Sequence, residues 1–294
     1  MAFNIDTFKT RALTAAIFGV VMLTGMLWNQ WSLLILFTII HFGCWWEYFN
    51  LIEKIHNTSI NPFIRQGFML IGFGLVLFLA GPSYQIAGYA LKYNLALPVS
   101  AAGFVMLVMG IFQKSAVHLK AMGASALGWI YISLSWGLML YLYHHVWTLH
   151  LGEYSYEITE RFLPILIVAS IWINDTMAYI VGSLIGKTPL SPISPKKTWE
   201  GTIGGIVLSV LIMAFGSCFI VFGEFNLQFS LFMGLIALIT SITGTMGDLL
   251  ESKLKRMAGV KDSGNFMPGH GGFLDRFDSL LIATVFAAIL VFLL

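Results

Sequence analysis

Charged residues are scarce in this chain of 294 residues. They make up 10% of the sequence, whereas soluble domains carry roughly 25%. Hydrophobic residues reach 58%, and the mean hydropathy is +0.84. The polar stretches are too short to form a separate soluble domain. This balance excludes a soluble globular protein and predicts an all-α, polytopic integral membrane protein.

Four other features are weak or absent. The net charge of +2 is too small for a nucleic-acid binder, so we expect no nucleic acid among the partners. Cys44 and Cys218 both lie in apolar runs and are predicted to be buried side chains, not a disulfide or a metal pair. The seven histidines show no zinc-like spacing. No small-residue cleavage site follows the first apolar run, which we predict to be a retained helix.

Nine apolar runs are long enough, or nearly so, to cross a membrane, which takes about 20 residues in a helix. Gly81 and Pro82 interrupt the third run, and the last run is short. We expect about five helices in residues 1–160, as a scaffold with lipid access. About four are expected in residues 161–294, as the catalytic region with two motif loops. The runs are 11–29, 31–52, 68–90, 95–113, 124–148, 162–186, 201–222, 229–249 and 279–294.

Lys and Arg residues in the loops set the predicted orientation, because they are enriched on the cytoplasmic side. With a cytoplasmic N-terminus and nine spans, only Lys92 and Arg161 of the 16 Lys and Arg residues fall outside. The C-terminus is then predicted outside. Loops 187–200 and 250–278 share the cytoplasmic face, where nucleotides and magnesium are available. The length suits an enzyme of the prokaryotic inner (cytoplasmic) membrane.

The few charges of the chain gather between two long apolar runs. From Ser252 to Ser279 the sequence reads SKLKRMAGVKDSGNFMPGHGGFLDRFDS. Such a concentration at one membrane face suits a site for a metal ion and a polyphosphate. The charged residues are Lys253, Lys255, Arg256, Lys261, Asp262, Asp275, Arg276 and Asp278.

An acidic residue also lies inside the sixth apolar run. Asp175, Tyr179 and Gly182 are spaced i, i+4, i+7 and therefore share one helical face. An ionisable residue at membrane depth is costly and by default indicates a functional role. The alternative is a structural carboxylate bonded to a neighbouring helix.

The segment before the seventh run combines a helix start with two lysines. Ser194 before Pro195 predicts an N-cap with proline at the first helical position. A helix N-terminus beside Lys196 and Lys197 can bind an anion. The alternative is a lysine pair that only sets topology. Glycines after residue 200 are expected to let the following helix pack closely.

Acidic residues mark the end of the eighth run. Asp248, Glu251, Ser252 and Lys255 are spaced i, i+3, i+4, i+7 and form one polar stripe as the helix leaves the bilayer. Two carboxylates one turn apart can hold a hard divalent cation through oxygen ligands. The alternative is a solvated helix end.

A glycine-rich loop precedes the last run. In Pro268-Gly269-His270-Gly271-Gly272, glycines allow backbone amides to approach an anion closely. Lys261 and Asp262 lie before this loop. Asp275 and Asp278, spaced i, i+3 at the start of the last helix, can bind a metal there.

These motifs together resemble the signature of the phosphatidate cytidylyltransferases, also called CDP-diacylglycerol synthases. The chain meets the signature without gaps, although Met267 stands where leucine is commoner. The stretches 175–182 and 194–201 also resemble the family, whereas before residue 172 only the pattern of apolar runs agrees. The matching residues are Ser252, Leu254, Lys255, Arg256, Lys261, Asp262, Gly264, Met267, Pro268, His270, Gly271, Gly272, Phe273, Asp275, Arg276, Phe277 and Asp278.

The resemblance implies a helical membrane protein that forms a homodimer and has a cytosol-facing polar cavity open sideways to lipid. It also implies a two-cation centre held by Asp248 and Asp275. The metal of the family is Mg²⁺, with K⁺ suggested as a second cation. The implied reaction transfers a cytidylyl group from CTP to phosphatidate and gives CDP-diacylglycerol and pyrophosphate.

A hypothesis for the roles of the residues follows from that reaction. The lipid phosphate is already an anion, so catalysis is expected to be positioning plus electrostatic stabilisation, with no strong general base. The expected metal ligands are Asp248, Glu251, Asp275 and Asp278. The expected catalytic residues are Asp248, Asp275, Lys255, Arg256, Lys261, Arg276 and His270. The expected substrate-binding residues are Ser194, Lys196, Lys197, Thr198, Asp175, Tyr179, Asp262, Gly271 and Gly272.

Two other functions remain open at this stage. A CTP-dependent kinase of a polyprenol or phytol would transfer the γ-phosphoryl group and release CDP. An ion-coupled transporter would use Asp175 and Asp248 as ion sites, but no internal repeat supports it. A structural scaffold would not need so many charges near one bilayer surface.

Overall fold

The computed structural model describes residues 5–113, 118–144, 146–151, 154–158, 161–222, 225–266 and 271–293. Within these residues, eight helices are long and apolar enough to cross a membrane. A shorter apolar helix, Ala16–Leu27, lies within α1 (Ile5–Leu27). Each of the nine predicted runs therefore falls on a helix. The prediction of an all-α polytopic membrane protein is confirmed, and the orientation of the termini stays a prediction.

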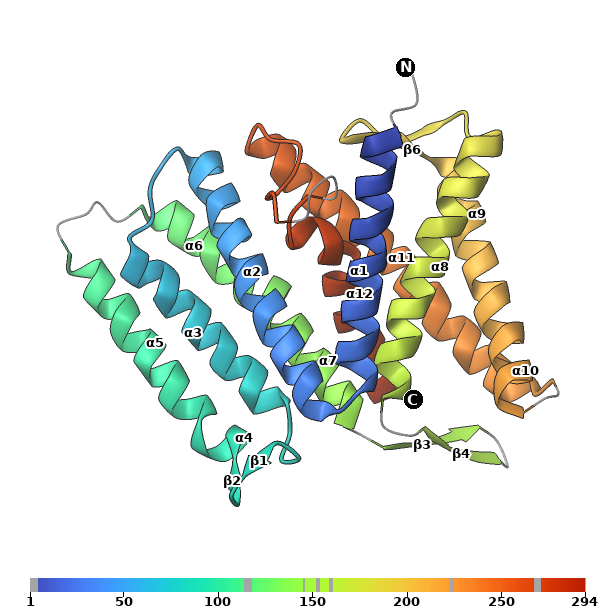
Figure 1. The fold of residues 1–294 in the computed structure, drawn as a ribbon, viewed down its shortest axis with the longest axis horizontal. Coiled ribbons are helices and arrows are strands. Elements are labelled where there is room, and N and C mark those ends of the chain that lie inside the picture. The colour runs from blue at the N-terminus through green and yellow to red at the C-terminus, as the bar shows by residue number, and fades with distance from the viewer. Residues whose placement is uncertain are drawn as a thin grey trace. The chain divides into compact units, whose positions relative to one another are not determined.

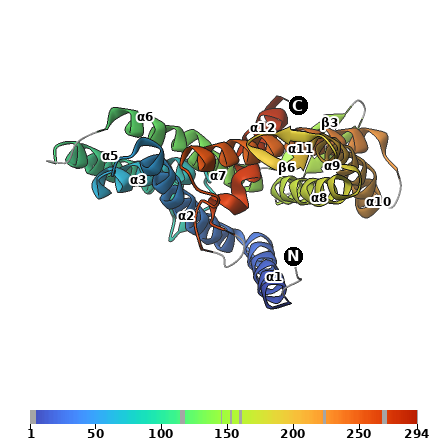
Figure 2. The same cartoon turned by 90° about the horizontal axis from the view of Figure 1, so that it is seen from above.

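The chain divides into two compact units, each built from two stretches of sequence (Figures 1 and 2). Unit 1 comprises residues 1–141 and 254–277, and unit 2 comprises residues 142–253 and 278–294. The boundaries cross two long helices, α11 (Leu227–Met257) and α12 (Leu274–Leu293). The segment between these helices, together with the last residues of α11 and the first residues of α12, thus belongs to unit 1. The rest of both helices belongs to unit 2.

Unit 1 is built around α2 (Gln30–His56). The side chain of Asn29 accepts from the Ser32 amide and starts this helix, and Asn57 ends it in the left-handed conformation. Trp45 is fully buried, and its Nε1 donates to Ser133 Oγ at 2.9 Å. The other elements are α1, α3 (Pro62–Leu79), β1 (Gln85–Ile86), β2 (Tyr89–Ala90), α4 (Leu91–Asn94), α5 (Ala96–Ile111), α6 (Leu119–Gly128), the π-helix η1 (Trp129–Leu134) and most of α7 (Ser135–His144).

Unit 2 contains a closely packed pair of helices, α8 (Phe162–Ile185) and α9 (Trp199–Leu211), which lie side by side in Figures 1 and 2. A Cβ atom added at Gly201 or Gly205 would lie 2.8 Å from a backbone oxygen of α8. The predicted close packing after residue 200 is confirmed. The other elements are β3 (Trp147–Leu151), β4 (Tyr154–Ile158), β5 (Pro189–Ser191), β6 (Ser194–Thr198), the π-helix η2 (Ile212–Gly216), α10 (Ser217–Phe222) and most of α11 and α12.

The structure corrects the limits of three predicted helices. The third covers Pro62–Leu79 instead of 68–90, because Asn61 caps it early and Pro82 cannot donate a backbone hydrogen bond beyond its end. The eighth, α11, continues to Met257, so the predicted polar stripe lies on one continuous helix. The last, α12, begins at Leu274 and includes Asp275 and Asp278 in its first turns, as predicted.

Candidate active site

Three carboxylates converge in unit 2. Asp248 and Glu251 lie one turn apart on α11, and Asp278 lies on α12. One carboxylate oxygen from each residue lies within 4.8 Å of the others. Glu251 is fully buried, while Asp248 and Asp278 are half-buried. Three of the four predicted metal ligands are therefore brought together by two separate helices.

The backbones of the two helices approach closely at Gly247. A Cβ atom added at Gly247 would collide with the carbonyl oxygen of Asp278 and would lie 3.1 Å from the Cα atom of Ser279. Small residues permit such contacts between membrane helices. The missing side chain at residue 247 thus places Asp248 beside Asp278.

A lysine from the β5–β6 hairpin reaches this carboxylate group. Lys197 forms an ion pair with Asp248, and both side chains are partly buried. The neighbouring Lys196 is exposed, whereas Lys197 is half-buried. The two lysines predicted to bind phosphate together are separated in this way, and Lys197 is the one held at the acidic group.

The prediction that Ser194 caps a helix starting at Pro195 is wrong. Residues 194–198 form strand β6, which pairs antiparallel with β5 and keeps the chain extended up to Thr198. Helix α9 begins at Trp199, and Thr198 is its N-cap, because its hydroxyl accepts from the Gly201 amide at 3.1 Å. The hydrogen bonds between β5 and β6 outweigh the local preference of Ser194-Pro195 for a helix start.

The chemistry of the donor set decides which metal the carboxylate group fits. Asp248, Glu251 and Asp278 offer oxygen atoms, which hard cations such as Mg²⁺ and Ca²⁺ prefer. Within the described residues, the group contains no histidine or cysteine, the ligands that zinc prefers. The three residues therefore fit a hard divalent cation.

The fourth predicted ligand, Asp275, belongs to unit 1 and forms a dense set of contacts there. Its Oδ1 accepts from Lys255 Nζ at 2.7 Å. Its Oδ2 accepts from the backbone amides of Ser263 and Gly272, both at 2.8 Å. The Lys255 ammonium and the two amides compensate the charge of this half-buried carboxylate. Its role as a metal ligand stays a prediction.

Sequence reasoning missed Glu47, which lies on α2 and is 4% exposed. Its carboxylate accepts from the backbone amides of Phe273 and Leu274, both at 2.9 Å. The hydroxyl of Ser263 lies 2.7 Å from its Oε2. The sequence did carry a signal for this residue, because an ionisable side chain inside an apolar run is costly unless it is paired.

The remaining predicted site residues are less tied to their surroundings. Asp175 is exposed on α8, where the Asn174 amide nitrogen lies 3.4 Å from its Oδ1, and Tyr179 is 77% exposed on the same helix. His270 lies outside the described residues. Four further predicted site residues of unit 1 are exposed: Arg256, Lys261, Asp262 and Arg276. Their roles, and those of Gly271 and Gly272, stay predictions.

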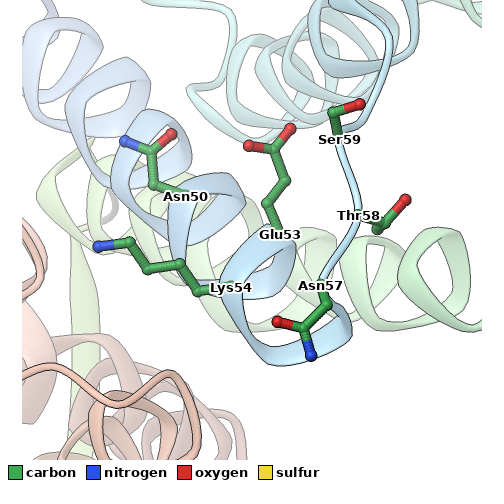
Figure 3. A pocket seen from close by; sticks show the side chains of 6 residues that line it. All are labelled: Asn50, Glu53, Lys54, Asn57, Thr58 and Ser59. Carbon is green, nitrogen blue, oxygen red and sulfur yellow. The ribbon is translucent and has the colours of Figure 1, made fainter.

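Unit 1 also contains an open polar pocket of about 590 Å³ at the end of α2. Figure 3 shows Asn50, Glu53 and Lys54 from the helix, and Asn57, Thr58 and Ser59 from the loop that follows. Arg65 donates to Asn50 at 2.5 Å, and the Ile60 amide donates to Glu53 at 2.7 Å. The side chains of Asn50 and Glu53 thus help to hold the loop and helix α3 in place.

Comparison with known proteins identifies the family of the chain. The model of the cytidylyltransferase family matches residues 9–294, and the chain belongs to that family. A phosphatidate cytidylyltransferase of Staphylococcus aureus is 31% identical over 93% of this chain and 95% of its own length. One from Staphylococcus haemolyticus is 51% identical over 38% of this chain and 42% of its own length. Family membership disfavours the transporter that the sequence left open.

Replacing Gly247 by alanine tests the helix contact that gathers the carboxylates. The added methyl group collides with α12, and overpacking of this kind costs about 1–3 kcal/mol of unfolding free energy. Gly244→Ala is the matched control on the same helix, because its Cβ atom finds its nearest neighbours at 3.6 Å. We expect thermal unfolding of the purified protein to show a lower melting temperature for Gly247→Ala only.

Added Mg²⁺ extends this test to the metal site. A ligand that binds the folded state raises the melting temperature. We expect this rise in the wild type and in Gly244→Ala, and a smaller rise in Gly247→Ala. Equal melting temperatures and an equal response to Mg²⁺ in both variants would contradict the helix contact as the origin of the site.

Proposed function

We propose that this chain transfers the cytidylyl group of CTP to phosphatidate, so that pyrophosphate is released and CDP-diacylglycerol stays in the membrane. The observation that carries the proposal is the convergence of Asp248, Glu251 and Asp278 at the ends of two membrane helices, with Lys197 beside them. The chain belongs to the cytidylyltransferase family, and its relatives named phosphatidate cytidylyltransferase supply the identity of the acceptor.

The reaction exchanges one phosphorus–oxygen bond for another. An oxygen of the lipid phosphate bonds to the α-phosphorus of CTP, and the bond from this phosphorus to the oxygen that bridges to the β-phosphate breaks. A phosphomonoester has a second pKa of about 6 and is already an anion at neutral pH. The barrier therefore lies in bringing two anions together and in stabilising the charge that forms on pyrophosphate.

The basic residues of the chain suit that task. Lys197 and Lys255 already lie against the carboxylates of Asp248 and Asp275, so substrate phosphates that reach the acidic residues meet an ammonium group there. Arg256, Lys261 and Arg276 are exposed and can neutralise further phosphate charge, and His270 is retained as a donor to a phosphate oxygen. The proposed substrate contacts are Ser194, Lys196, Thr198, Asp175, Tyr179, Asp262, Gly271 and Gly272.

A divalent cation fits the carboxylate group of unit 2. Asp248, Glu251 and Asp278 would hold Mg²⁺, and we retain Asp275 as the further ligand and K⁺ as the second cation that the resemblance implies. When bound, the cation would supply positive charge that draws the substrates together and stabilises the leaving pyrophosphate. The carboxylates of the chain would hold the cation in position, and the lysines would add positive charge beside it.

The membrane setting is part of the proposal. The distribution of Lys and Arg residues supports a site that faces the cytoplasm, where CTP is available, and the bacterial relatives support a prokaryotic inner membrane. Residues 161–294 would carry most of the catalytic groups, and residues 1–160 the scaffold with lipid access. The homodimer is proposed on the resemblance alone.

The proposed reaction is tested by its products. Purified protein is incubated with phosphatidate, Mg²⁺ and each of the four labelled nucleoside triphosphates, and lipid-linked nucleotide and pyrophosphate are measured together. We expect both products in equal amounts, with CTP as the preferred nucleotide. Release of CDP from an added polyprenol or phytol, without lipid-linked nucleotide, would show a lipid kinase instead.

The proposed metal ligands are tested by Asp248→Asn and Asp275→Asn. Each substitution removes a carboxylate charge at similar size, and we expect CTP-dependent turnover to fall by at least about 100-fold. Glu53→Gln is the control, because Glu53 pairs with Arg65 and has no role in the proposed site. Membrane insertion is checked by the yield of folded, detergent-extracted protein. Turnover close to wild type in either aspartate variant would remove that residue from the proposed site.

A further inference from the structure

Within the described residues, the hydrogen-bond partners of the Glu47 side chain all lie between Ser263 and Leu274 in unit 1. Its Oε1 accepts from the Phe273 amide, and its Oε2 accepts from the Leu274 amide, with Ser263 Oγ at 2.7 Å. The partners are 216 to 227 residues away along the chain. A Cβ atom added at Gly264 or Gly272 would collide with the same carboxylate. Residues 263–264 and 272–274 thus surround this side chain.

Glu47 also completes the start of helix α12. The first amides of a helix have no partner within the helix, and a carboxylate suits this positive end. Leu274 is the first residue of α12, and Phe273 precedes it. A side chain from α2 therefore takes the place of a local cap. The segment could not keep both amides in this arrangement near the membrane without an acceptor for them.

Ser263 connects Glu47 with Asp275. Its hydroxyl oxygen lies 2.7 Å from Glu47 Oε2 and 2.8 Å from Asp275 Oδ2, and its backbone amide donates to the same Oδ2. Asp275 in turn holds the ammonium group of Lys255 at 2.7 Å. A displacement of Glu47 would therefore pass through Ser263 to a carboxylate and a lysine that the proposed reaction uses.

We propose that Glu47 is a positioning residue for cytidylyl transfer. Its carboxylate anchors Ser263, Phe273 and Leu274 to α2 and fixes the Asp275–Lys255 pair in the geometry that the reaction needs. This inference rests on the proposed function. It assigns to the N-terminal helices a part in the site beyond scaffold and lipid access, and it gives a reason for the buried acid in an apolar helix.

The carboxylate chemistry can be separated from packing by two substitutions. Glu47→Gln keeps the size, but its single oxygen cannot replace both carboxylate oxygens, so an NH₂ group faces a donor. Glu47→Asp keeps both oxygens on a side chain one methylene shorter. We expect turnover per folded molecule to fall by about 10- to 100-fold in the Gln variant and by less in the Asp variant. A residue that only fills space would give the opposite order.

The contact between Glu47 and its partner segment can be tested without any substrate, by measuring how fast a cysteine in that segment is labelled. Asn265 is exposed in this segment, and both native cysteines, Cys44 and Cys218, are fully buried. In an Asn265→Cys protein, we expect a water-soluble maleimide to react roughly tenfold faster when Glu47→Gln is added, because the segment opens locally. Glu53→Gln on the same helix is the control and should change neither the labelling rate nor turnover.

Ser263→Ala keeps the test decisive if the Gln variant does not fold. It should also lower turnover. The double variant Ser263→Ala/Glu47→Asp should lose less turnover than the two single effects combined predict, because both residues act through one network. Wild-type turnover with unchanged labelling in Glu47→Gln, or full additivity, would overturn the proposal. If the wild type transfers no cytidylyl group, the proposed function fails, and the labelling rates alone support or overturn the anchor.

Discussion

Three acidic side chains held within 4.8 Å of one another at the ends of membrane helices are the constraint on which the rest of the site depends. Like charges at this distance repel, and burial makes each charge more costly. The contact between α11 and α12 at Gly247 nevertheless brings Asp248 and Asp278 together, and Lys197 supplies one compensating charge. Three carboxylates held together in this way are suited to bind a cation. Its positive charge would attract the negatively charged phosphates of both substrates.

Unit 1 uses a related arrangement for its own acids. Asp275 is held by Lys255 and by backbone amides, and Glu47 is held by the amides at the start of α12. In both units a lysine lies against a carboxylate that the reaction would use. Cytidylyl transfer between two anions would need fixed charges more than a strong base, and in the proposed mechanism this network would supply them. The proposed role of these buried polar groups is therefore positioning.

The sequence predicted the helices, and it singled out three acidic residues that the structure brings together, for a physical reason. Apolar runs of membrane length and helical spacings such as Asp248–Glu251 are local patterns, and the lipid enforces the helix. Glu47 was missed because its partners are more than 200 residues away, so no local spacing reveals them. Ser194 was misread because the pairing of β6 with β5 outweighs a Ser-Pro cap signal. Side-chain partners depend on the packing of distant segments, which periodicity does not encode.

The most direct test of the account is to locate the cation itself. Crystals of the protein grown with Mn²⁺ in place of Mg²⁺, with and without CTP, would be examined by anomalous diffraction at the manganese edge. The account predicts an anomalous peak within coordination distance of carboxylate oxygens from both Asp248 and Asp278. It also predicts that the CTP phosphates contact the same ion. Density for CTP with no peak at these carboxylates, and Lys197 still bound to Asp248, would contradict it.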